Sequence, residues 1–367
     1  MRLLQITKDN GPVQKELFFH EKNFDIENTV FTYTISARAM CNEEGSVVYR
    51  FPFEFKGPFI LFPRIGVVFR HLVNMIDVSD IELVHAHFLS MDGYIAYKIK
   101  KKYGIPYVVT VRNTDLNLPG LWEFPWNKIV LKRTLREASG IIFLSKSYKK
   151  KLYDRLDPSY QEEIEKKSYI IPNGINNFYL DNRFGRKKLG NTVKVLSVGD
   201  IVRNKNHVAV AEAIMNVRDK GYDISYEVVG KKLDGHIVTT LEKSGVKVTN
   251  FCDKTELIKI YRDNDIFVMP SFRESFGLVY AEALSQGMPV VYSKGEGFDG
   301  QFEEGEVGYG VNPYSVDEIT SVIIKLIGEY DRLSSNACFV AKSFAWDIVT
   351  EKNVNVYKKV ISRKDRS

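Results

Sequence analysis

Short apolar runs alternate with segments of helical periodicity in the first half of the chain. The predicted strands are residues 3–7, 29–35, 46–51, 81–86, 106–111, 140–144 and 169–172. Runs such as YVVTV and GIIFL are continuously apolar, which is typical of parallel strands buried on both faces. A helix is expected near residues 90–103, because Gly104 and Pro106 then mark its end and the entry to the next strand.

The alternation begins again at Val193. Helices are expected over residues 206–220 and from the capping box of Ser315 and Glu318 up to Gly328. The runs that predict strands in this half are VKVLSVG, ISYEVVG, VKVTNF, DIFVMPS and PVVYS. Such alternation predicts a parallel sheet covered on both faces, and its repetition predicts two doubly wound α/β domains. We expect ligands beyond the carboxyl ends of the strands, in a cleft between the domains.

The composition narrows the class of protein. At ~150 residues per domain, 367 residues suffice for about two domains, and a 44% hydrophobic chain with 27% charged residues is not disordered. Three scattered cysteines exclude a disulfide scaffold and a cysteine zinc site, and they favour the reducing cytoplasm. No apolar run reaches the ~18 residues of a spanning helix. Periodicity lapses at residues 176–191, and we place the domain junction there, after residue 185.

Charge divides the chain unevenly. Residues 1–190 carry 29 lysines and arginines against 21 acids, whereas residues 191–367 carry 23 against 25. Bases and aromatic residues are interleaved at residues 56–76 and 119–136, where Leu121, Trp122, Phe124 and Trp126 lie together. This pattern favours a peripheral contact of the first domain with an anionic membrane. The alternative is that the aromatic residues belong to the core and the bases only solvate the surface. Nucleic acid is not an expected partner, since the bases belong to no recognisable binding module.

The most informative segment is PSFRESFGLVYAEALSQGMP at residues 270–289. A strand ends at Pro270, a loop holds Glu274, and Gly277 stands near the start of a helix that contains Glu282. A helix amino terminus presents unpaired N–H groups that suit a phosphate, and glycine lets a ligand approach the backbone closely. Two carboxylates around that helix start could flank the phosphate and accept hydrogen bonds from hydroxyl groups.

This segment resembles the nucleotide-sugar signature of family 4 retaining glycosyltransferases, which have the GT-B fold of two Rossmann-like domains. Three further stretches resemble the same family in its order: DIELVHAHF at residues 80–88, IPNGI at 171–175 and VGDIVRNKNH at 198–207. The tail that begins FAW resembles the closing helix that returns to the first domain. The resemblance implies an N-terminal acceptor domain at residues 1–185, a C-terminal nucleotide-sugar domain at 186–345, and a returning helix at 346–367.

The resemblance also assigns roles to residues. Glu282 would hold the ribose hydroxyls of the donor, Glu274 would contact the donor sugar, and Lys205 would neutralise the diphosphate, with Arg203 as a second cation. Two positions depart from the family pattern: Asp200 stands where many relatives have arginine, and Arg112 stands where many have a histidine that touches the donor sugar. We interpret Arg112 as a substitute contact. The other implied positions are Gly11, Gly199, Gly230, Phe276, Gly277 and Leu278 on the donor side and His85, His87 and Asp115 on the acceptor side.

The leading hypothesis is a retaining glycosyltransferase that moves a sugar from a UDP- or GDP-sugar to a hydroxyl group, in polysaccharide or lipid-linked glycan synthesis. Two alternatives stay open: a nucleotide-sugar epimerase of similar two-domain fold, and a non-catalytic carbohydrate- or membrane-binding protein with a decayed site. No metal or other cofactor is expected, because His85 and His87 have no third ligand spaced near them. No Gly-x-Gly-x-x-Gly follows a strand, so a dinucleotide dehydrogenase has no support.

Overall fold

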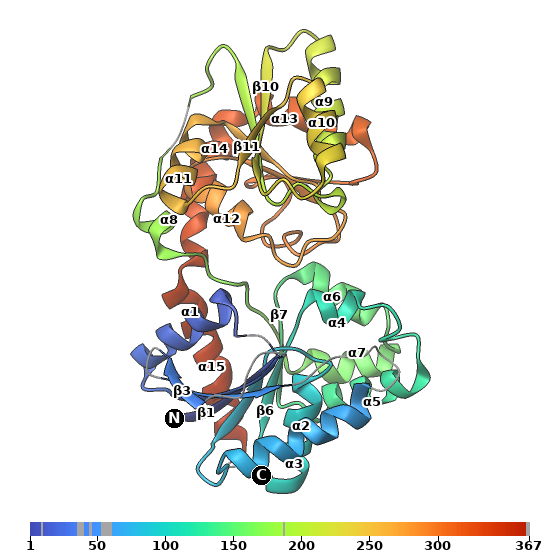
Figure 1. Ribbon diagram of the computed structural model, residues 1–367, viewed down its shortest axis with the longest axis vertical. Coiled ribbons are helices and arrows are strands. Elements are labelled where there is room, and N and C mark those ends of the chain that lie inside the picture. Colours follow the sequence, from blue (N-terminus) through green and yellow to red (C-terminus); the bar gives the residue numbers. More distant parts are fainter. Residues whose placement is uncertain (9, 35–39, 44–45, 53–60, 186–187, 365–367) are drawn as a thin grey trace. The chain divides into compact units, whose positions relative to one another are not determined.

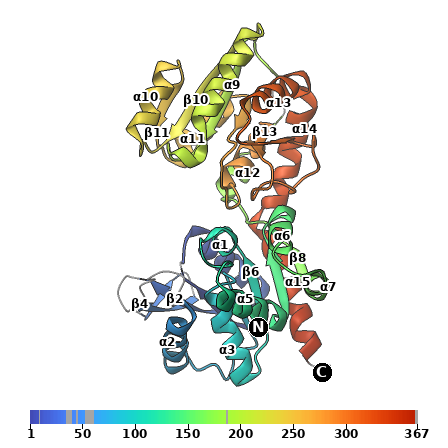
Figure 2. The same cartoon turned by 90° about the vertical axis from the view of Figure 1, so that its right-hand side faces the viewer.

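The chain folds into two compact units (Figures 1 and 2). The computed structural model describes residues 1–8, 10–34, 40–43, 46–52, 61–185 and 188–364. Unit 1 comprises Met1–Gly174 and Trp346–Ser367, and unit 2 comprises Ile175–Ala345. Among the described helices, none is long and apolar enough to cross a membrane.

The boundary between the units lies before the position that the polar stretch indicated. It falls after Gly174 rather than after residue 185, because the short helix α8 (Asn177–Asp181) is attached to unit 2. The side chain of Gln286 donates a hydrogen bond to the carbonyl of Tyr179 (3.2 Å), and the Phe184 amide donates to the carbonyl of Ser285 (3.1 Å). The residues after Gly174 therefore pack on unit 2 as part of it, although their polar sequence is typical of a linker.

Unit 1 contains an eight-stranded sheet in the order β3-β4-β2-β1-β5-β6-β7-β8. All neighbouring strands are parallel except β3 and β4. The strands are β1 (Arg2–Thr7), β2 (Glu27–Thr34), β3 (Met40–Glu43), β4 (Ser46–Pro52), β5 (Leu83–Ala86), β6 (Tyr107–Val111), β7 (Gly140–Phe143) and β8 (Ser168–Ile170). The predicted strands of this half are therefore confirmed apart from their ends, with residue 35 outside the described part, and β3 is an addition.

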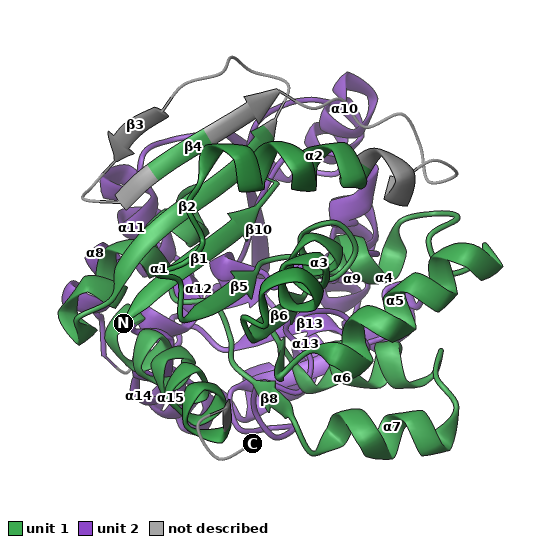
Figure 3. Cartoon of the chain, turned by 90° about the horizontal axis from the view of Figure 1, so that it is seen from below, with its two compact units in different colours: residues 1–174, 346–367 green, residues 175–345 purple. Residues whose placement is uncertain are grey.

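Helices cover both faces of this sheet (Figure 3). Helices α2, α3 and α5 lie on one face, and α1 and α15 lie on the other, where they bury Phe18 and Tyr357 against strand residues such as Leu3 and Val108. The helical elements are α1 (Pro12–Glu21), η1 (Lys22–Phe24), α2 (Leu61–Met75), α3 (Asp92–Tyr103), α4 (Asn113–Asn117), α5 (Pro125–Glu137), α6 (Lys146–Tyr153), α7 (Pro158–Glu165) and α15 (Trp346–Lys364). The expected helix end at Gly104 is present, with the glycine at φ 71°.

Unit 2 contains a six-stranded sheet in the order β11-β10-β9-β12-β13-β14, with all neighbours parallel. The strands are β9 (Val193–Val198), β10 (Ile224–Gly230), β11 (Lys247–Asn250), β12 (Ile266–Val268), β13 (Val290–Ser293) and β14 (Gly308–Val311). The order reverses direction between β9 and β12, and open α/β sheets bind their ligands at such a switch point, beyond the carboxyl ends of the strands.

The helices of unit 2 also form two layers. Ile214 of α9 and Ile323 of α13 belong to the core on one face of the sheet, and the rings of Tyr261 in α11 and Tyr280 in α12 pack on Phe267 from the other face, with ring centroids 6.2 and 5.3 Å apart. Besides α8, the helical elements are η3 (Arg203–Lys205), α9 (His207–Asp219), α10 (Gly235–Lys243), α11 (Lys254–Asp263), α12 (Leu278–Ser285), α13 (Val316–Gly328), α14 (Tyr330–Val340) and η4 (Ala341–Phe344).

Candidate active site

Two glycines shape the backbone at the switch point of unit 2. Gly199 follows β9 directly, and Gly230 ends β10 beside it. A Cβ atom on Gly230 would lie 1.9 Å from the Gly199 carbonyl oxygen, so the two loops approach each other only because residue 230 is glycine. The structure thus gives Gly230 a packing role, and its contact with a donor stays a prediction.

Lys205 and Glu274 meet at this switch point. Lys205 ends η3 after β9, Glu274 lies in the loop after β12, and the Lys205 Nζ donates to Glu274 Oε2 at 2.7 Å. Their side chains are only 21% and 11% exposed, and the Ser271 hydroxyl donates to the same carboxylate oxygen at 3.3 Å. Arg203 is exposed in the same turn as Lys205. The strands therefore bring together a cation and an anion that lie 69 residues apart in the chain.

The loop that carries Glu274 is held from several sides. The Glu296 carboxylate accepts a hydrogen bond from the Glu274 amide (2.9 Å), and the Gly297 amide donates to the Glu274 carbonyl (3.1 Å). Asn206, at φ 60°, donates from its side-chain amide to the carbonyls of Pro270 (3.1 Å) and Pro313 (2.7 Å). Sequence reasoning did not find Glu296 or Asn206. The signals available were the glycine-rich run around Glu296 and the tolerance of asparagine for a left-handed backbone.

The start of α12 lies next to this loop. Gly277, at φ 77°, precedes the helix, and a Cβ atom there would lie 2.4 Å from the Tyr280 ring and 3.2 Å from Glu274 Cγ. Phe276 is buried against Phe344. Leu278 is the first helical residue, so its N–H belongs to the amides that find no acceptor within the helix. This helix start offers N–H groups and a positive dipole end, as the sequence predicted.

Glu282 lies one turn inside α12. Its Oε2 accepts a hydrogen bond from the Tyr261 hydroxyl at 3.0 Å, and no described residue donates to its Oε1. Burial raises the pKa of the Glu282 carboxyl to about 7, and the bond from Tyr261 opposes part of that rise. Tyr261 is fully buried, and the sequence analysis did not identify it. Glu282 therefore keeps one carboxylate oxygen available for a ligand.

In unit 1, the residues expected on the acceptor side are buried at the end of β5. The His85 ring bonds the Tyr357 hydroxyl through Nδ1 (2.7 Å) and the Thr110 hydroxyl through Nε2 (2.8 Å), and burial lowers its pKa to about 3. His87 Nε2 bonds Gln5 Oε1 (2.9 Å), whereas its Nδ1 is buried without a partner in the described chain. His85 is therefore saturated by the fold, and His87 retains one open nitrogen.

Arg112 and Asp115 follow β6 at the same edge of the sheet. The Arg112 Nε donates to the His87 carbonyl (2.9 Å), its guanidinium lies 5.5 Å from the Phe88 ring centroid, and burial lowers its pKa to about 10. The Asp115 carboxylate accepts from the amides of Leu89 (3.0 Å), Ser90 (2.9 Å) and Arg112 (2.9 Å) and from the Ser90 hydroxyl (2.8 Å). Both Asp115 oxygens are thus used inside unit 1, and we assign Asp115 a structural role in place of the acceptor contact that the resemblance implied.

Three further features of the candidate site are a small cavity in unit 1, the position of Gly11 and the lack of a metal-ligand group among the described residues. His85, His87, Arg112 and Trp346 line a cavity of about 20 Å³, the size of one water molecule. Gly11 lies in the loop after β1 and precedes α1 with an extended backbone at φ −77°. In the described part of the chain, no group of three or more histidine, cysteine or acidic side chains is placed to hold a metal ion.

Comparisons with known proteins identify the family and the fold. A family model described as "Glycosyl transferases group 1" matches residues 180–337, and one described as "Glycosyltransferase Family 4" matches residues 22–177. An uncharacterized glycosyltransferase of Methanocaldococcus jannaschii is 23% identical over 282 residues, which are 75% of this chain and 74% of that protein.

Solved structures share the whole fold. Sucrose-phosphate synthase from Thermosynechococcus elongatus has a TM-score of 0.75 at 16% identity and covers 99% of this chain and 100% of its own. HepE of Anabaena, solved in complex with UDP, has a TM-score of 0.71 at 16% identity and covers 98% and 100%. The structure of HepE in complex with UDP-glucose has a TM-score of 0.65 at 17% identity, and it also covers 98% of this chain and 100% of its own.

The two α/β units with mainly parallel sheets, the family models and the similar structures together identify the protein as a glycosyltransferase of the GT-B fold. The chain belongs to glycosyltransferase family 4, because its first half matches that family model and its second half matches the accompanying group 1 model. The predicted family, fold class and enzyme class are confirmed. The epimerase and the non-catalytic alternative are not favoured by these matches.

Proposed function

We propose that this glycosyltransferase takes its sugar from a nucleotide diphosphate sugar and transfers it to a hydroxyl group with retention of configuration. The observation that carries the proposal is the cluster at the switch point of unit 2. There Lys205 contacts Glu274, Gly277 precedes α12, and Glu282 keeps one carboxylate oxygen without a donor among the described residues. HepE, which has the same fold, was solved with UDP and with UDP-glucose, and this supports a nucleotide-linked donor.

Each group of the cluster matches one part of such a donor. The N–H groups at the start of α12 and the Lys205 ammonium suit the two negative charges of a diphosphate. The Glu282 carboxylate suits the ribose, whose two hydroxyls are donors, and Glu274 suits hydroxyls of the transferred sugar. Arg203 is a second cation within the same turn as Lys205.

The chemistry follows from where charge develops. The acceptor oxygen forms a bond to the anomeric carbon on the face from which the diphosphate departs, and the bond from that carbon to the phosphate oxygen breaks. The leaving phosphate oxygen takes the proton of the acceptor hydroxyl. Lys205 stabilises the charge that grows on this phosphate, so the enzyme contributes position and electrostatics. The proposed reaction therefore needs no metal ion.

The acceptor we propose is a glycan, free or lipid-linked, that unit 1 binds. Arg112 and His87 lie at the carboxyl edge of the unit 1 sheet, beside the small cavity, and His87 Nδ1 has no partner among the described residues. These two side chains could contact a hydroxyl or phosphate of the acceptor. Polysaccharide or lipid-linked glycan synthesis is the corresponding setting.

The experiment is a screen of UDP-, GDP- and ADP-sugars by thermal shift, followed by turnover with the donors that bind. A ligand at a hundredfold excess over its Kd stabilises the folded protein by about 2.7 kcal/mol. Release of the nucleoside diphosphate that depends on an added acceptor, survives EDTA and gives product of unchanged anomeric configuration supports the proposal. Inversion, or conversion of the donor without an acceptor, contradicts it.

A further inference from the structure

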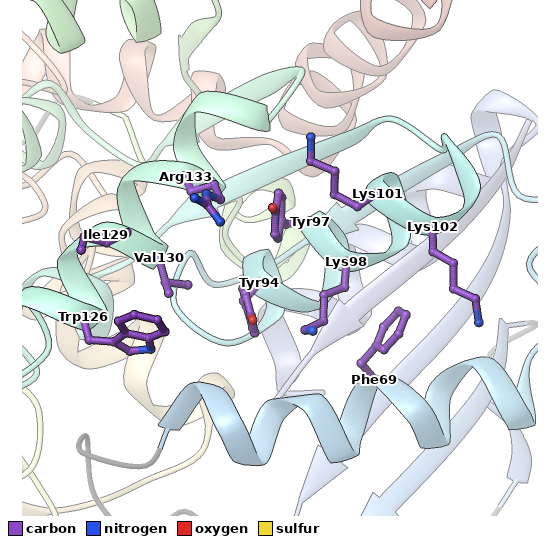
Figure 4. Close-up of a pocket in the computed structure, with 10 residues that line it drawn as sticks. All are labelled: Phe69, Tyr94, Tyr97, Lys98, Lys101, Lys102, Trp126, Ile129, Val130 and Arg133. Atoms are coloured by element: carbon purple, nitrogen blue, oxygen red, sulfur yellow. The ribbon is translucent and has the colours of Figure 1, made fainter.

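Unit 1 has a groove between its outer helices, which we call the α3–α5 groove (Figure 4). Its cavity measures about 520 Å³, and its lining comes from α2, α3 and α5. The rings of Tyr94 and Tyr97 stack with their centroids 6.0 Å apart, and Phe69 and Trp126 complete the aromatic lining. This aromatic surface lies outside the candidate active site, and neither the reaction nor the core explains it.

Three of the four bases that line the groove are unpaired among the described residues, and the fourth, Lys101, pairs with Glu137 at 3.0 Å. Lys98, Lys102 and Arg133 line the cavity and form no ion pair with the described acidic residues, and none of the lining residues is acidic. The Lys98 ammonium lies over two rings, 5.1 Å from the centroid of Tyr94 and 5.7 Å from that of Phe69. Aromatic faces hold the cation in place without cancelling its charge. The groove thus presents positive charge to whatever enters it.

A second cavity beside α5 shows that this is not a general property of the basic surface. It measures about 420 Å³ and shares Arg133 with the first. Its own cations are paired: Lys132 with Asp157 at 2.6 Å and Arg136 with Glu163 at 3.1 Å. On α5, Lys132 and Arg136 are therefore paired, and the unpaired bases Lys98 and Lys102 of the first groove come from α3.

Exposed apolar side chains lie at the first turns of α5. Trp126 is 67% exposed and Ile129 is 53% exposed, whereas Leu121 and Trp122, which the sequence pattern grouped with Trp126, are buried. The core explanation is therefore right for Leu121 and Trp122 and wrong for Trp126. An exposed indole next to unpaired bases is typical of surfaces that adsorb at the membrane interface.

We propose that the α3–α5 groove docks unit 1 on an anionic membrane. Lys98, Lys102 and Arg133 take the phosphate oxygens of the lipid headgroups, and Trp126 and Ile129 enter the boundary between headgroups and acyl chains. A small soluble anion would neutralise the bases but leave Trp126 and Ile129 in water, so the lipid surface fits both features. The proposal concerns where the enzyme works and does not depend on the donor assignment.

The test uses the full-length protein and co-sedimentation with vesicles. One set contains phosphatidylcholine alone, and the other contains phosphatidylcholine with phosphatidylglycerol. The variant Lys98→Gln/Lys102→Gln/Arg133→Gln removes the unpaired cations. Its matched control, Lys132→Gln/Arg136→Gln/Lys149→Gln, removes the same charge from bases that are all paired, since Lys149 bonds Glu165 at 2.5 Å.

We expect binding to anionic vesicles only, weakened by salt as the Debye length shortens. Each base near such a surface contributes about 1 kcal/mol, so the groove variant should lose about a hundredfold in partition and the control should lose far less. The tryptophan emission should shift to the blue on binding, and Trp126→Phe should abolish the shift because Trp122 and Trp346 are buried.

Several results would overturn the proposal. These are recovery of the wild type in the supernatant with anionic vesicles at low salt, equal losses in the two triple variants, and displacement by millimolar glycerol phosphate, which would indicate a site for a soluble phosphate. Tight binding of single-stranded RNA that the groove variant loses, without vesicle binding, would replace a membrane by a nucleic acid. The nucleotide-sugar thermal shift should be unchanged in the groove variant, which separates this test from that of the donor site.

Discussion

The carboxyl edges of the two sheets carry polar clusters of opposite character. In unit 1 the fold itself satisfies most of the cluster: Asp115 accepts four hydrogen bonds, and both His85 nitrogens are bonded. In unit 2 the cluster keeps groups without partners, because no described residue donates to Glu282 Oε1 and Gly277 precedes a helix start with free N–H groups. A polar residue at a switch point can therefore serve stability or binding, and the count of its internal hydrogen bonds distinguishes the two.

The largest effect should be the loss of stability when the Asp115 carboxylate is removed from the cluster in unit 1. In Asp115→Ala, the amides of Leu89, Ser90 and Arg112 lose their acceptor, at a cost of about 1 kcal/mol or more for each. We expect a loss of at least ~3 kcal/mol in the free energy of unfolding, measured by urea titration. The exposed Asp154→Ala in the same unit is the control. An Asp115→Ala protein of wild-type stability would show that the residue is free to contact an acceptor.

Next in size is the effect of Lys205→Ala on turnover. The negative charge on the departing diphosphate grows as the glycosidic bond breaks, so the cation matters most in the transition state. We expect kcat to fall by about 10²–10³-fold, with a much smaller change in donor affinity. Lys243→Ala, on the exposed side of α10, should leave both unchanged. Retained kcat with a raised KM would mean that Lys205 binds only the ground state.

Removal of the Glu282 carboxylate should weaken nucleotide binding without disturbing the fold. The ribose hydroxyls would lose a charge-assisted partner, which corresponds to about 1.5–3 kcal/mol, or roughly ten- to a hundredfold in Kd. Isothermal titration calorimetry of Glu282→Ala against the exposed Glu212→Ala measures this loss. Unchanged affinity in a folded Glu282→Ala protein would remove the residue from the donor site.

The smallest effect is a pH dependence of donor affinity. Burial raises the pKa of Glu282 to about 7, so the free protein holds this carboxyl protonated below that pH, whereas ribose hydroxyls donate best to the ionised form. Binding must then release a proton, and affinity should fall by about fivefold between pH 7 and pH 6, toward the lower affinity of Glu282→Ala. A nucleotide sugar is the probe, because its diphosphate has no group that titrates in this range. Glu282→Gln should give a flat profile, and a wild-type profile that is equally flat would contradict the assignment.

The sequence predicted the parts of the fold in which local pattern and burial agree. The run YVVTV became β6, and the Ser315 cap of α13 is present, with its hydroxyl accepting from the Glu318 amide at 3.2 Å. The strand β14 was not predicted, since two of the four residues in its sequence, GYGV, are glycines, which are depleted in strands. Gly308 is required there because a Cβ atom would lie 1.8 Å from the Val290 carbonyl, which only the neighbouring strand reveals.

The candidate site divides in the same way. Glu274 and Gly277 could be predicted because they lie between a strand end and a helix start, which the sequence marks, whereas Lys205 was implied by the resemblance to the family. The saturation of Asp115 could not, because its partners Leu89 and Ser90 come from another loop. The sequence also could not show that Trp126 is exposed and Trp122 is buried. Trp122 precedes the start of α5 and Trp126 lies in its first turn, so no single helical periodicity relates the two residues.

The position of α15 has a consequence for how the protein is made. Helix α15 is synthesised after unit 2, yet its Tyr357 hydroxyl donates to Glu21 (2.9 Å) and forms a hydrogen bond with His85, and both residues precede unit 2 by far. A ribosome releases all of unit 2 before this helix emerges. Until then, Glu21 and His85 lack partners that the finished core requires. Unit 1, most of which is translated first, therefore cannot complete its folding before unit 2 has been translated. A chain that ends before Trp346 would leave unit 1 without the helix that packs on one face of its sheet.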